Sequence, residues 1–370
     1  MNTFTNSYVV TNRQYADDTF GSSPQTAGDL SYLMALVPGK GIDYQSDASQ
    51  YAVVANGNTT DATLPPDFST ALLSDLQATL DSSQRAYLTV FIHGLDTDWT
   101  DATKDLALVG NGLRALPGID LQPKNGASSA ASIPAAFPAP WYTGLVVGFS
   151  WPSVQIGLPD FISDFHANRT NANASTVSLA NFLNALQGLA TQFTGGLELS
   201  LLAHSEGTYV TQQAGGVLPQ GSAAVVSQVV LLAADLDTTA LGSYPNKTPC
   251  GAGLSQGAAQ VTAYWSVHDD VLGLVGNVAA YRAARHWGTC ICDGTIGRLG
   301  KSGPPADQSL YANCISLDCS SIVNEQDAPS GVETHLAYLY IPQVLQDIAQ
   351  VLMGQTPTQR TGSTPRQTLC

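Results

Sequence analysis

The chain has 370 residues, of which 44% are hydrophobic and only 12% are charged, which is typical of a globular protein with a large core. Its net charge of −15 and its 14 scattered basic residues argue against nucleic acid or an anionic membrane as a partner, because both need a basic patch. No apolar run approaches the roughly 20 residues that a membrane-spanning helix requires.

The first 80 residues predict edge strands followed by a helix. The β-branched segment 7–13 (SYVVTNR) and the apolar segment 31–38 (SYLMALVP) favour strands. Residues 67–80 have helical periodicity. We expect these to be the early edge strands and first helix of a doubly wound domain.

Further along, short apolar runs predict buried parallel strands, which carry helices on both faces. One run covers 87–92, ends in His93-Gly94 and is followed by a polar loop, and another covers 144–150 and stops at Pro152. A connector is expected over 117–140 and a loop over 154–173. An amphipathic helix is expected over 175–193, with Ser175 or Thr176 as its cap.

The segment 197–210 (LELSLLAHSEGTYV) organises the rest of the chain. An apolar run leads into Ala203-His204-Ser205-Glu206-Gly207, and a helix-compatible stretch follows. Small residues two positions before and after Ser205 allow the strand and the helix to pass closely. This segment resembles the nucleophile elbow of the α/β-hydrolase superfamily, in which a serine side chain is exposed at a strained turn.

Several motifs in one order extend the resemblance over roughly residues 8–352. They are YVVTNR, VFIHG, FSWPS, LLAHSEGT, VVLLAADLD, VTAYWSVHDD and a late Thr334-His335. Together they are similar to a largely uncharacterised bacterial branch of α/β-hydrolases. Glu206 departs from that branch, where methionine is more usual, and so does a cysteine-bearing insert at about 246–330. The resemblance implies one domain over 1–370 with a doubly wound, mostly parallel sheet. The C-terminal insertion is expected to be stapled by disulfides, and the expected mechanism needs no cofactor or metal.

A catalytic triad in this superfamily runs serine, acid, histidine along the chain. Ser205 is the expected nucleophile. The downstream histidines are His268, His286 and His335, and the resemblance favours the late His335 as the base.

The acid remains open between positions after two different strands. Asp269 follows the predicted strand 261–266, where this superfamily usually carries its acid. Asp235 and Asp237 follow the preceding strand and are alternatives, although both suit helix caps. Asp270, next to Asp269, is a further candidate.

The resemblance places the oxyanion hole at the backbone N–H groups of Leu95 and Glu206. We expect His93 to brace that loop, His204 to pack beside the nucleophile, and the Glu206 carboxylate to favour a helix start. Candidate pocket residues are His93, Trp99, Trp151, Trp265 and His268.

The six cysteines indicate disulfides in an oxidising compartment, because most of them cluster in Gly/Pro/Asn-rich sequence near the C-terminus. They are Cys250, Cys290, Cys292, Cys314, Cys319 and Cys370, and their pairing is open. We therefore expect a secreted protein that is a monomer.

These features favour a serine hydrolase that cleaves a small or polymeric carboxylic ester, such as a lipid or polyester, through an acyl-enzyme. A non-catalytic scaffold of the same fold, or a serine peptidase or amidase, would use much the same sequence. The motifs do not separate these alternatives.

Overall fold

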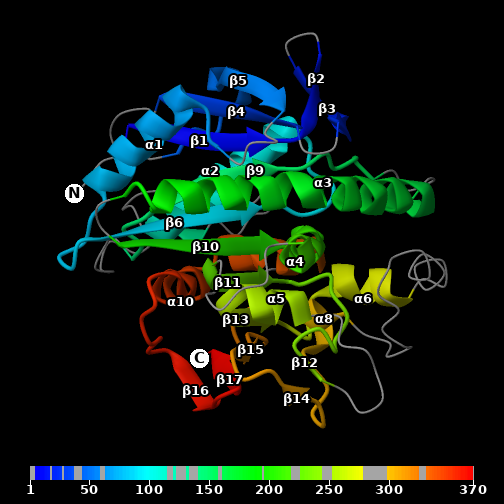
Figure 1. The fold of residues 1–370 in the computed structure, drawn as a ribbon. Coiled ribbons are helices and arrows are strands. Elements are labelled where there is room, and N and C mark those ends of the chain that lie inside the picture. The colour runs from blue at the N-terminus through cyan, green and yellow to red at the C-terminus, as the bar shows by residue number, and fades with distance from the viewer. Residues whose placement is uncertain are drawn as a thin grey trace.

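A computed structural model gives the fold of the chain (Figure 1). The residues that it describes are 5–16, 19–26, 29–36, 44–58, 63–114, 120–121, 131–132, 141–156, 161–193, 196–217, 226–243, 252–277, 298–324 and 331–369.

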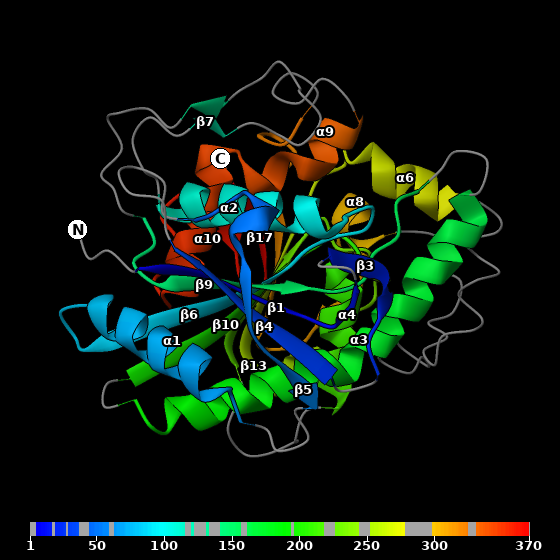
Figure 2. The same cartoon turned by 90° about the horizontal axis from the view of Figure 1, so that it is seen from above.

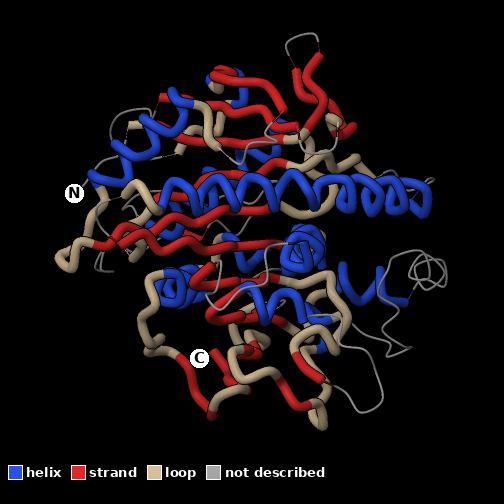
Figure 3. Tube along the Cα trace, in the orientation of Figure 1, coloured by secondary structure: helices blue, strands red, loops and turns tan. Residues whose placement is uncertain are grey.

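An 11-stranded sheet runs through the middle of the molecule (Figures 1 and 3). In spatial order its strands are β16 (Arg360–Ser363), β17 (Arg366–Leu369), β15 (Cys314–Asp318), β13 (Ala258–Trp265), β11 (Val226–Leu232), β10 (Gly196–His204), β6 (Arg85–Ile92), β9 (Leu145–Ser150), β1 (Asn6–Thr11), β4 (Asp29–Leu36) and β5 (Ala52–Asn58). Every pairing from β17 across to β1 is parallel, and antiparallel strands continue the sheet at both edges. This confirms the predicted doubly wound, mostly parallel sheet.

Helices cover both faces of the sheet. They are α1 (Pro66–Ala78), α2 (Trp99–Arg114), α3 (Phe161–Ala190), α4 (Gly207–Val217), α5 (Ala252–Gly257), α6 (Asp270–Asn277), α8 (Leu299–Ser302), α9 (Gly331–Leu336) and α10 (Pro342–Leu352), with 3-10 turns η1 (Ala48–Gln50) and η4 (Ala337–Leu339). Figure 2 shows α2 and α10 along one face and α1 and α3 along the other. No helix in the described part of the chain is long and apolar enough to cross a membrane.

Small strand pairs lie outside the main sheet. They are β2 (Arg13–Ala16) with β3 (Thr19–Pro24), β7 (Asp120–Leu121) with β8 (Ala131–Ser132), and β12 (Gly242–Ser243) with β14 (Ser309–Leu310).

The central strands β6, β9 and β10 are the continuous apolar runs of the sequence. Leu145–Ser150 is buried throughout, and so is β6 after its first residue. Because these strands are parallel neighbours, their carboxyl ends meet at one edge of the sheet, where ligands of open α/β folds bind. The loops that carry Ser205 and Gly94 both leave from this edge.

Two helices differ from the prediction. Helix α3 begins at Phe161, so the expected loop over 154–173 is mostly helix, and Ser175 and Thr176 lie inside it rather than capping it. The polar segment after Gly94 becomes helix α2 from Trp99 onward. In both segments polar residues hide the helical pattern, and tertiary contacts overrule local propensity.

The region 246–330 is partly core. Strands β13 and β15 belong to the central sheet, so these segments are not an excursion from the fold. Cys314 and Cys319 are buried free thiols, which corrects the expectation that they form disulfides. Cys250, Cys290, Cys292 and Cys370, and most of the expected connector over 117–140, lie outside the described residues.

Candidate active site

Ser205 occupies the sharp turn between β10 and α4. Its φ of 53° lies in the left-handed region, which is uncommon for residues other than glycine. The Ser205 N–H donates to the carbonyl of Leu232 at 3.0 Å, and its carbonyl accepts the N–H of Asp235 at 3.3 Å. The end of β11 and the loop after it therefore hold the strained turn in place, as expected for a nucleophile elbow.

Two glycines let the chain pass close to this turn. A Cβ on Gly207 would lie 2.4 Å from the His93 carbonyl oxygen, which no real side chain permits. A Cβ on Gly94 would lie 2.9 Å from the Ser205 Cβ. The loop after β6 thus lies directly against the serine, and both glycines are required by space.

The structure brings together Ser205, His335 and Asp269. Along the chain, Ser205 lies 130 residues before His335, and Asp269 lies 66 residues before it. The Ser205 hydroxyl and His335 Nε2 are 2.8 Å apart, and His335 Nδ1 is 2.8 Å from Asp269 Oδ2. The other carboxylate oxygen of Asp269 accepts the N–H of Leu272 at 3.1 Å. Asp269 is fully buried, whereas Ser205 and His335 are 6% and 7% exposed. The arrangement can move the serine proton onto an oriented imidazole.

The other candidate acids have different partners. Asp235 binds the guanidinium groups of Arg169 and Arg298. Asp237 Oδ1 accepts from the backbone and hydroxyl of Thr239, as a turn residue does.

Asp270 and the remaining downstream histidines do not contact the Ser205–His335 pair in the described part of the chain. Asp270 begins α6, is exposed and forms an ion pair with Lys301. His268 lies half-buried in the turn beside Asp269, and its N–H donates to Ser266 Oγ. His286 lies outside the described residues. Asp269 is thus the carboxylate that contacts the His335 imidazole.

His204 supports the base, in agreement with its expected packing role. Its Nε2 is 3.0 Å from the backbone carbonyl oxygen of His335. A carbonyl only accepts, so His204 donates from Nε2. The two imidazole rings are 4.9 Å apart. His204 therefore ties the end of β10 to helix α9, which carries His335.

His93 braces the loop after β6. Its Nδ1 donates to the Gly94 carbonyl at 2.8 Å, and its ring stacks on Trp151 at 5.5 Å. Within the described residues, the N–H groups of Leu95 and Glu206 are not seen donating to another protein atom. Their role as oxyanion donors stays a prediction.

The Glu206 side chain enters a buried ion cluster instead of simply favouring a helix start. Its Oε1 is 3.2 Å from Arg169 Nε. Arg169 also binds the Asp235 carboxylate at 2.8 Å, and Arg298 contacts the same carboxylate at 2.9 Å. Burial raises the pKa of Glu206 to about 7, and the charge of Arg169 opposes the shift. Sequence reasoning missed this cluster, because its members are far apart in the chain.

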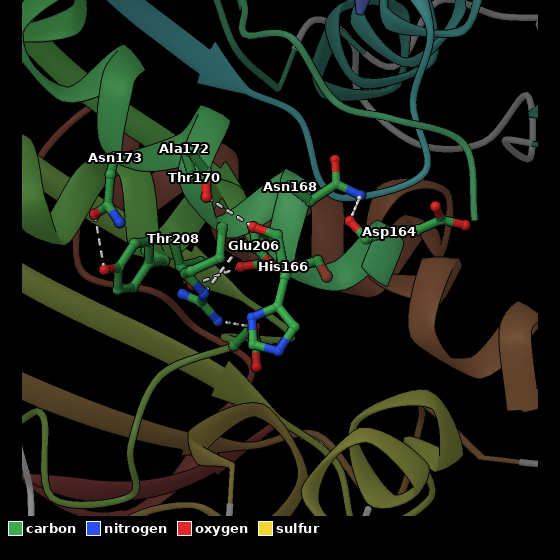
Figure 4. Close-up of polar contacts among 12 residues, drawn as sticks. Asp164, His166, Asn168, Thr170, Ala172, Asn173, Glu206 and Thr208 are labelled. Atoms are coloured by element: carbon green, nitrogen blue, oxygen red, sulfur yellow. Dashed lines mark hydrogen bonds and ion pairs between the residues drawn. The ribbon is translucent and has the colours of Figure 1, made fainter. Parts of the chain in front are cut away.

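An aromatic side chain completes the surroundings of Arg169. Its guanidinium carbon lies 3.8 Å from the ring centroid of Tyr209, a cation–π distance. The Tyr209 hydroxyl donates to Asn173 at 2.9 Å, and Figure 4 shows Asn173 and His166 on α3 near Glu206, whereas Asn168 points toward Asp164. Helix α3 therefore supplies a charged and polar wall next to the elbow.

The predicted pocket residues have mixed positions. Trp151 is fully buried, and Trp99 packs against Phe20 and Tyr51, so both are core residues rather than pocket residues. Their large rings fill the space between helices and sheet. Trp265 is half-buried and donates its indole N–H to Ser316 Oγ at 3.0 Å.

A comparison with known families agrees with this fold. Residues 69–285, more than half of the chain, match a family described as alpha/beta hydrolase of unknown function (DUF900). The chain belongs to this family. The hydrolase fold predicted from the motif order is thereby confirmed.

Among solved structures, the hydrolase is similar to the crystal structure of Aspergillus fumigatus lipase B. Sequence identity is 14% and the TM-score is 0.40, and the match covers 86% of this chain. It spans 62% of the length of the lipase chain. No curated protein matches the sequence.

Proposed function

We propose that the protein is a serine hydrolase of carboxylic esters that works through an acyl-enzyme. The unbroken hydrogen-bond chain from Ser205 through His335 to Asp269 carries the proposal. Ser205 and Asp269 lie in the turns that follow β10 and β13, and His335 lies on α9. A mere core packing role would not require a serine in a strained turn beside an oriented imidazole.

In the proposed reaction, His335 takes the Ser205 proton as the hydroxyl oxygen attacks the ester carbonyl. Asp269 accepts the Nδ1 hydrogen bond, which fixes the tautomer and stabilises the imidazolium. The N–H groups of Leu95 and Glu206 would bind the developing oxyanion, a contribution of about 3 kcal/mol per donor. His335 then protonates the leaving alcohol, and water hydrolyses the acyl-enzyme.

The test is hydrolysis of p-nitrophenyl esters, from acetate to palmitate, by the wild type and by Ser205→Ala. We expect turnover by the wild type and loss of at least three orders of magnitude in the variant. The chain-length preference would then measure the acyl pocket. Circular dichroism of both proteins serves as the folding control.

Other outcomes redirect the proposal. A folded wild type that turns over no ester, but cleaves an anilide or peptide series, would make the protein an amidase or peptidase with the same nucleophile. Absence of turnover on all of these substrates would favour a binding scaffold.

A further inference from the structure

Arg13 is a buried cation at the start of β2, beside the loop after β6. Its side chain is 1% exposed, yet it reaches several segments of the chain. Nε donates to Ser150 Oγ at 2.8 Å, and the two terminal nitrogens donate to the carbonyls of Gly21 at 3.2 Å and Thr97 at 2.6 Å. The guanidinium thus joins the N-terminal hairpin, the end of β9 and the loop at 93–98.

The same guanidinium also faces His93. Its second terminal nitrogen is 3.4 Å from His93 Nε2. Because a guanidinium only donates, His93 Nε2 accepts from Arg13, while Nδ1 carries the proton donated to the Gly94 carbonyl. Arg13 therefore contacts the loop at both ends, at His93 and at Thr97.

The FSWPS segment holds this loop from its other side. The indole N–H of Trp151 donates to the His93 carbonyl at 2.8 Å, and the Thr97 N–H donates to Ser153 Oγ at 3.3 Å. The TNR and FSWPS motifs, far apart in sequence, thus converge on the one loop that presses Gly94 against Ser205.

Burying the Arg13 cation is unfavourable for the free energy of folding, which indicates that this residue has a specific role. Burial lowers the pKa of Arg13 to about 9, and the carboxylate of Asp98 opposes this shift. Its hydrogen-bond partners are neutral oxygens and an imidazole nitrogen. A buried cation is unfavourable by several kcal/mol unless its hydrogen bonds are well made, and the planar fork of arginine satisfies divergent acceptors that lysine does not.

We propose that Arg13 is a positioning residue for the oxyanion loop: by fixing the Thr97 carbonyl and the His93 ring, it sets where the Leu95 N–H points relative to Ser205. The predicted effect of Arg13 on kcat rests on the proposed ester hydrolysis. The ordering of residues 93–98 by Arg13 does not depend on the substrate.

The kinetic test compares Arg13→Lys with Arg360→Lys. Arg360 in the C-terminal hairpin has a side chain that is only 4% exposed and binds Asp347, so it serves as the control arginine away from the loop at 93–98. Small displacements in an active site lower rates by as much as about 100-fold. We expect Arg13→Lys to lower kcat by about 10- to 100-fold with KM within threefold, whereas Arg360→Lys lowers the melting temperature and keeps kcat.

A second measurement does not depend on turnover. Backbone amide hydrogen exchange of the peptide that covers 93–98 should become faster in Arg13→Lys and remain unchanged in Arg360→Lys. Ser153→Ala, which removes only the partner of the Thr97 N–H, should show a smaller change in the same peptide. This variant keeps the test usable if Arg13→Lys fails to fold.

The outcomes separate the two proposals. Wild-type exchange at 93–98 and wild-type kcat in a folded Arg13→Lys protein would overturn the positioning role. Faster exchange at 93–98 in a protein that hydrolyses no ester would overturn the proposed function and retain the role of Arg13 in ordering the loop.

Discussion

Ser205 is held by contacts that its sequence neighbours could predict only in part. The small residues on either side of it indicated a tight turn, and Gly207 and Gly94 are indeed required by the approach of neighbouring chain. Its hydrogen bonds to Leu232 and Asp235, in contrast, come from the end of β11 and the loop after it. Local patterns predict a turn, whereas the partners of a turn depend on which strands become neighbours.

The acid of the triad could likewise be predicted from the sequence only in part. Sequence spacing left Asp269, Asp235, Asp237 and Asp270 open, because each follows or adjoins a strand end. The structure separates them by partner: Asp269 meets an imidazole, and Asp235 meets two guanidinium groups.

Exchanging these two aspartates for asparagine should therefore have different effects. Asp269→Asn should lower kcat by about 10⁴-fold with little change in KM, because an amide does not stabilise the imidazolium and favours the wrong imidazole tautomer. Asp235→Asn should keep kcat within tenfold and lower the free energy of unfolding by about 3 kcal/mol, because Arg298 and Arg169 lose this buried carboxylate, although Arg169 keeps its contact with Glu206. Steady-state kinetics and urea unfolding measure both effects, and the reverse pattern would reassign the acid.

Glu206→Gln should change how stability depends on pH. The pKa of Glu206 is about 7 in the folded protein, above its ordinary value of 4.5, because burial disfavours the charge. The folded state then binds a proton that the unfolded state has already lost, so wild-type stability falls as pH rises through this interval. We expect the melting temperature of Glu206→Gln, relative to wild type, to rise between pH 5 and pH 8. A constant difference would place the Glu206 pKa outside the interval.

At the scale of elements, the strands were easier to predict than the helices. Buried parallel strands such as β6, β9 and β10 are continuous apolar runs, so their sequence alone indicates them. The first half of α3 is polar, and only its tertiary contacts explain it. Asn168 is fully buried there, accepts the Val154 N–H at 2.6 Å and donates to the carbonyls of Val154 and Asp164.

Asn168→Ala should therefore destabilise the protein. The change removes an acceptor from the Val154 N–H and two donors from buried carbonyls, at about 1 kcal/mol for each bond. We expect the free energy of unfolding to fall by about 2–3 kcal/mol in urea unfolding. Thr170→Ala, at an exposed position of the same helix, is the control and should change it by less than about 0.5 kcal/mol. Equal effects would show that Asn168 does not anchor α3.

At the scale of the whole molecule, the C-terminal hairpin of β16 and β17 closes one edge of the sheet. The sequence did not predict it, because its residues are polar and its anchors are distant in the chain. Arg360 binds Asp347 on α10 at 2.5 Å, and Arg360 Nη2 also donates to the Tyr264 hydroxyl on β13 at 3.2 Å. The cluster therefore joins the last strands to a helix and to the central sheet.

Arg360→Met should lower the free energy of unfolding by about 3 kcal/mol without changing kcat, because it leaves the Asp347 carboxylate buried without its cation. Urea unfolding and ester hydrolysis measure the two quantities. Lys104→Met, which breaks an exposed ion pair with Asp101, is the control and should cost less than about 1 kcal/mol. A loss of kcat in Arg360→Met would show that the hairpin also shapes the active site.

The central claim is that Ser205 is a nucleophile activated by His335, and covalent labelling tests it most directly. We would react the protein with a fluorophosphonate and locate the adduct by peptide mass spectrometry, in the wild type and in His335→Ala. The account predicts one adduct, on Ser205, whose rate of formation falls at least 100-fold in His335→Ala. An unlabelled but folded wild type, or an adduct on another residue, would contradict it.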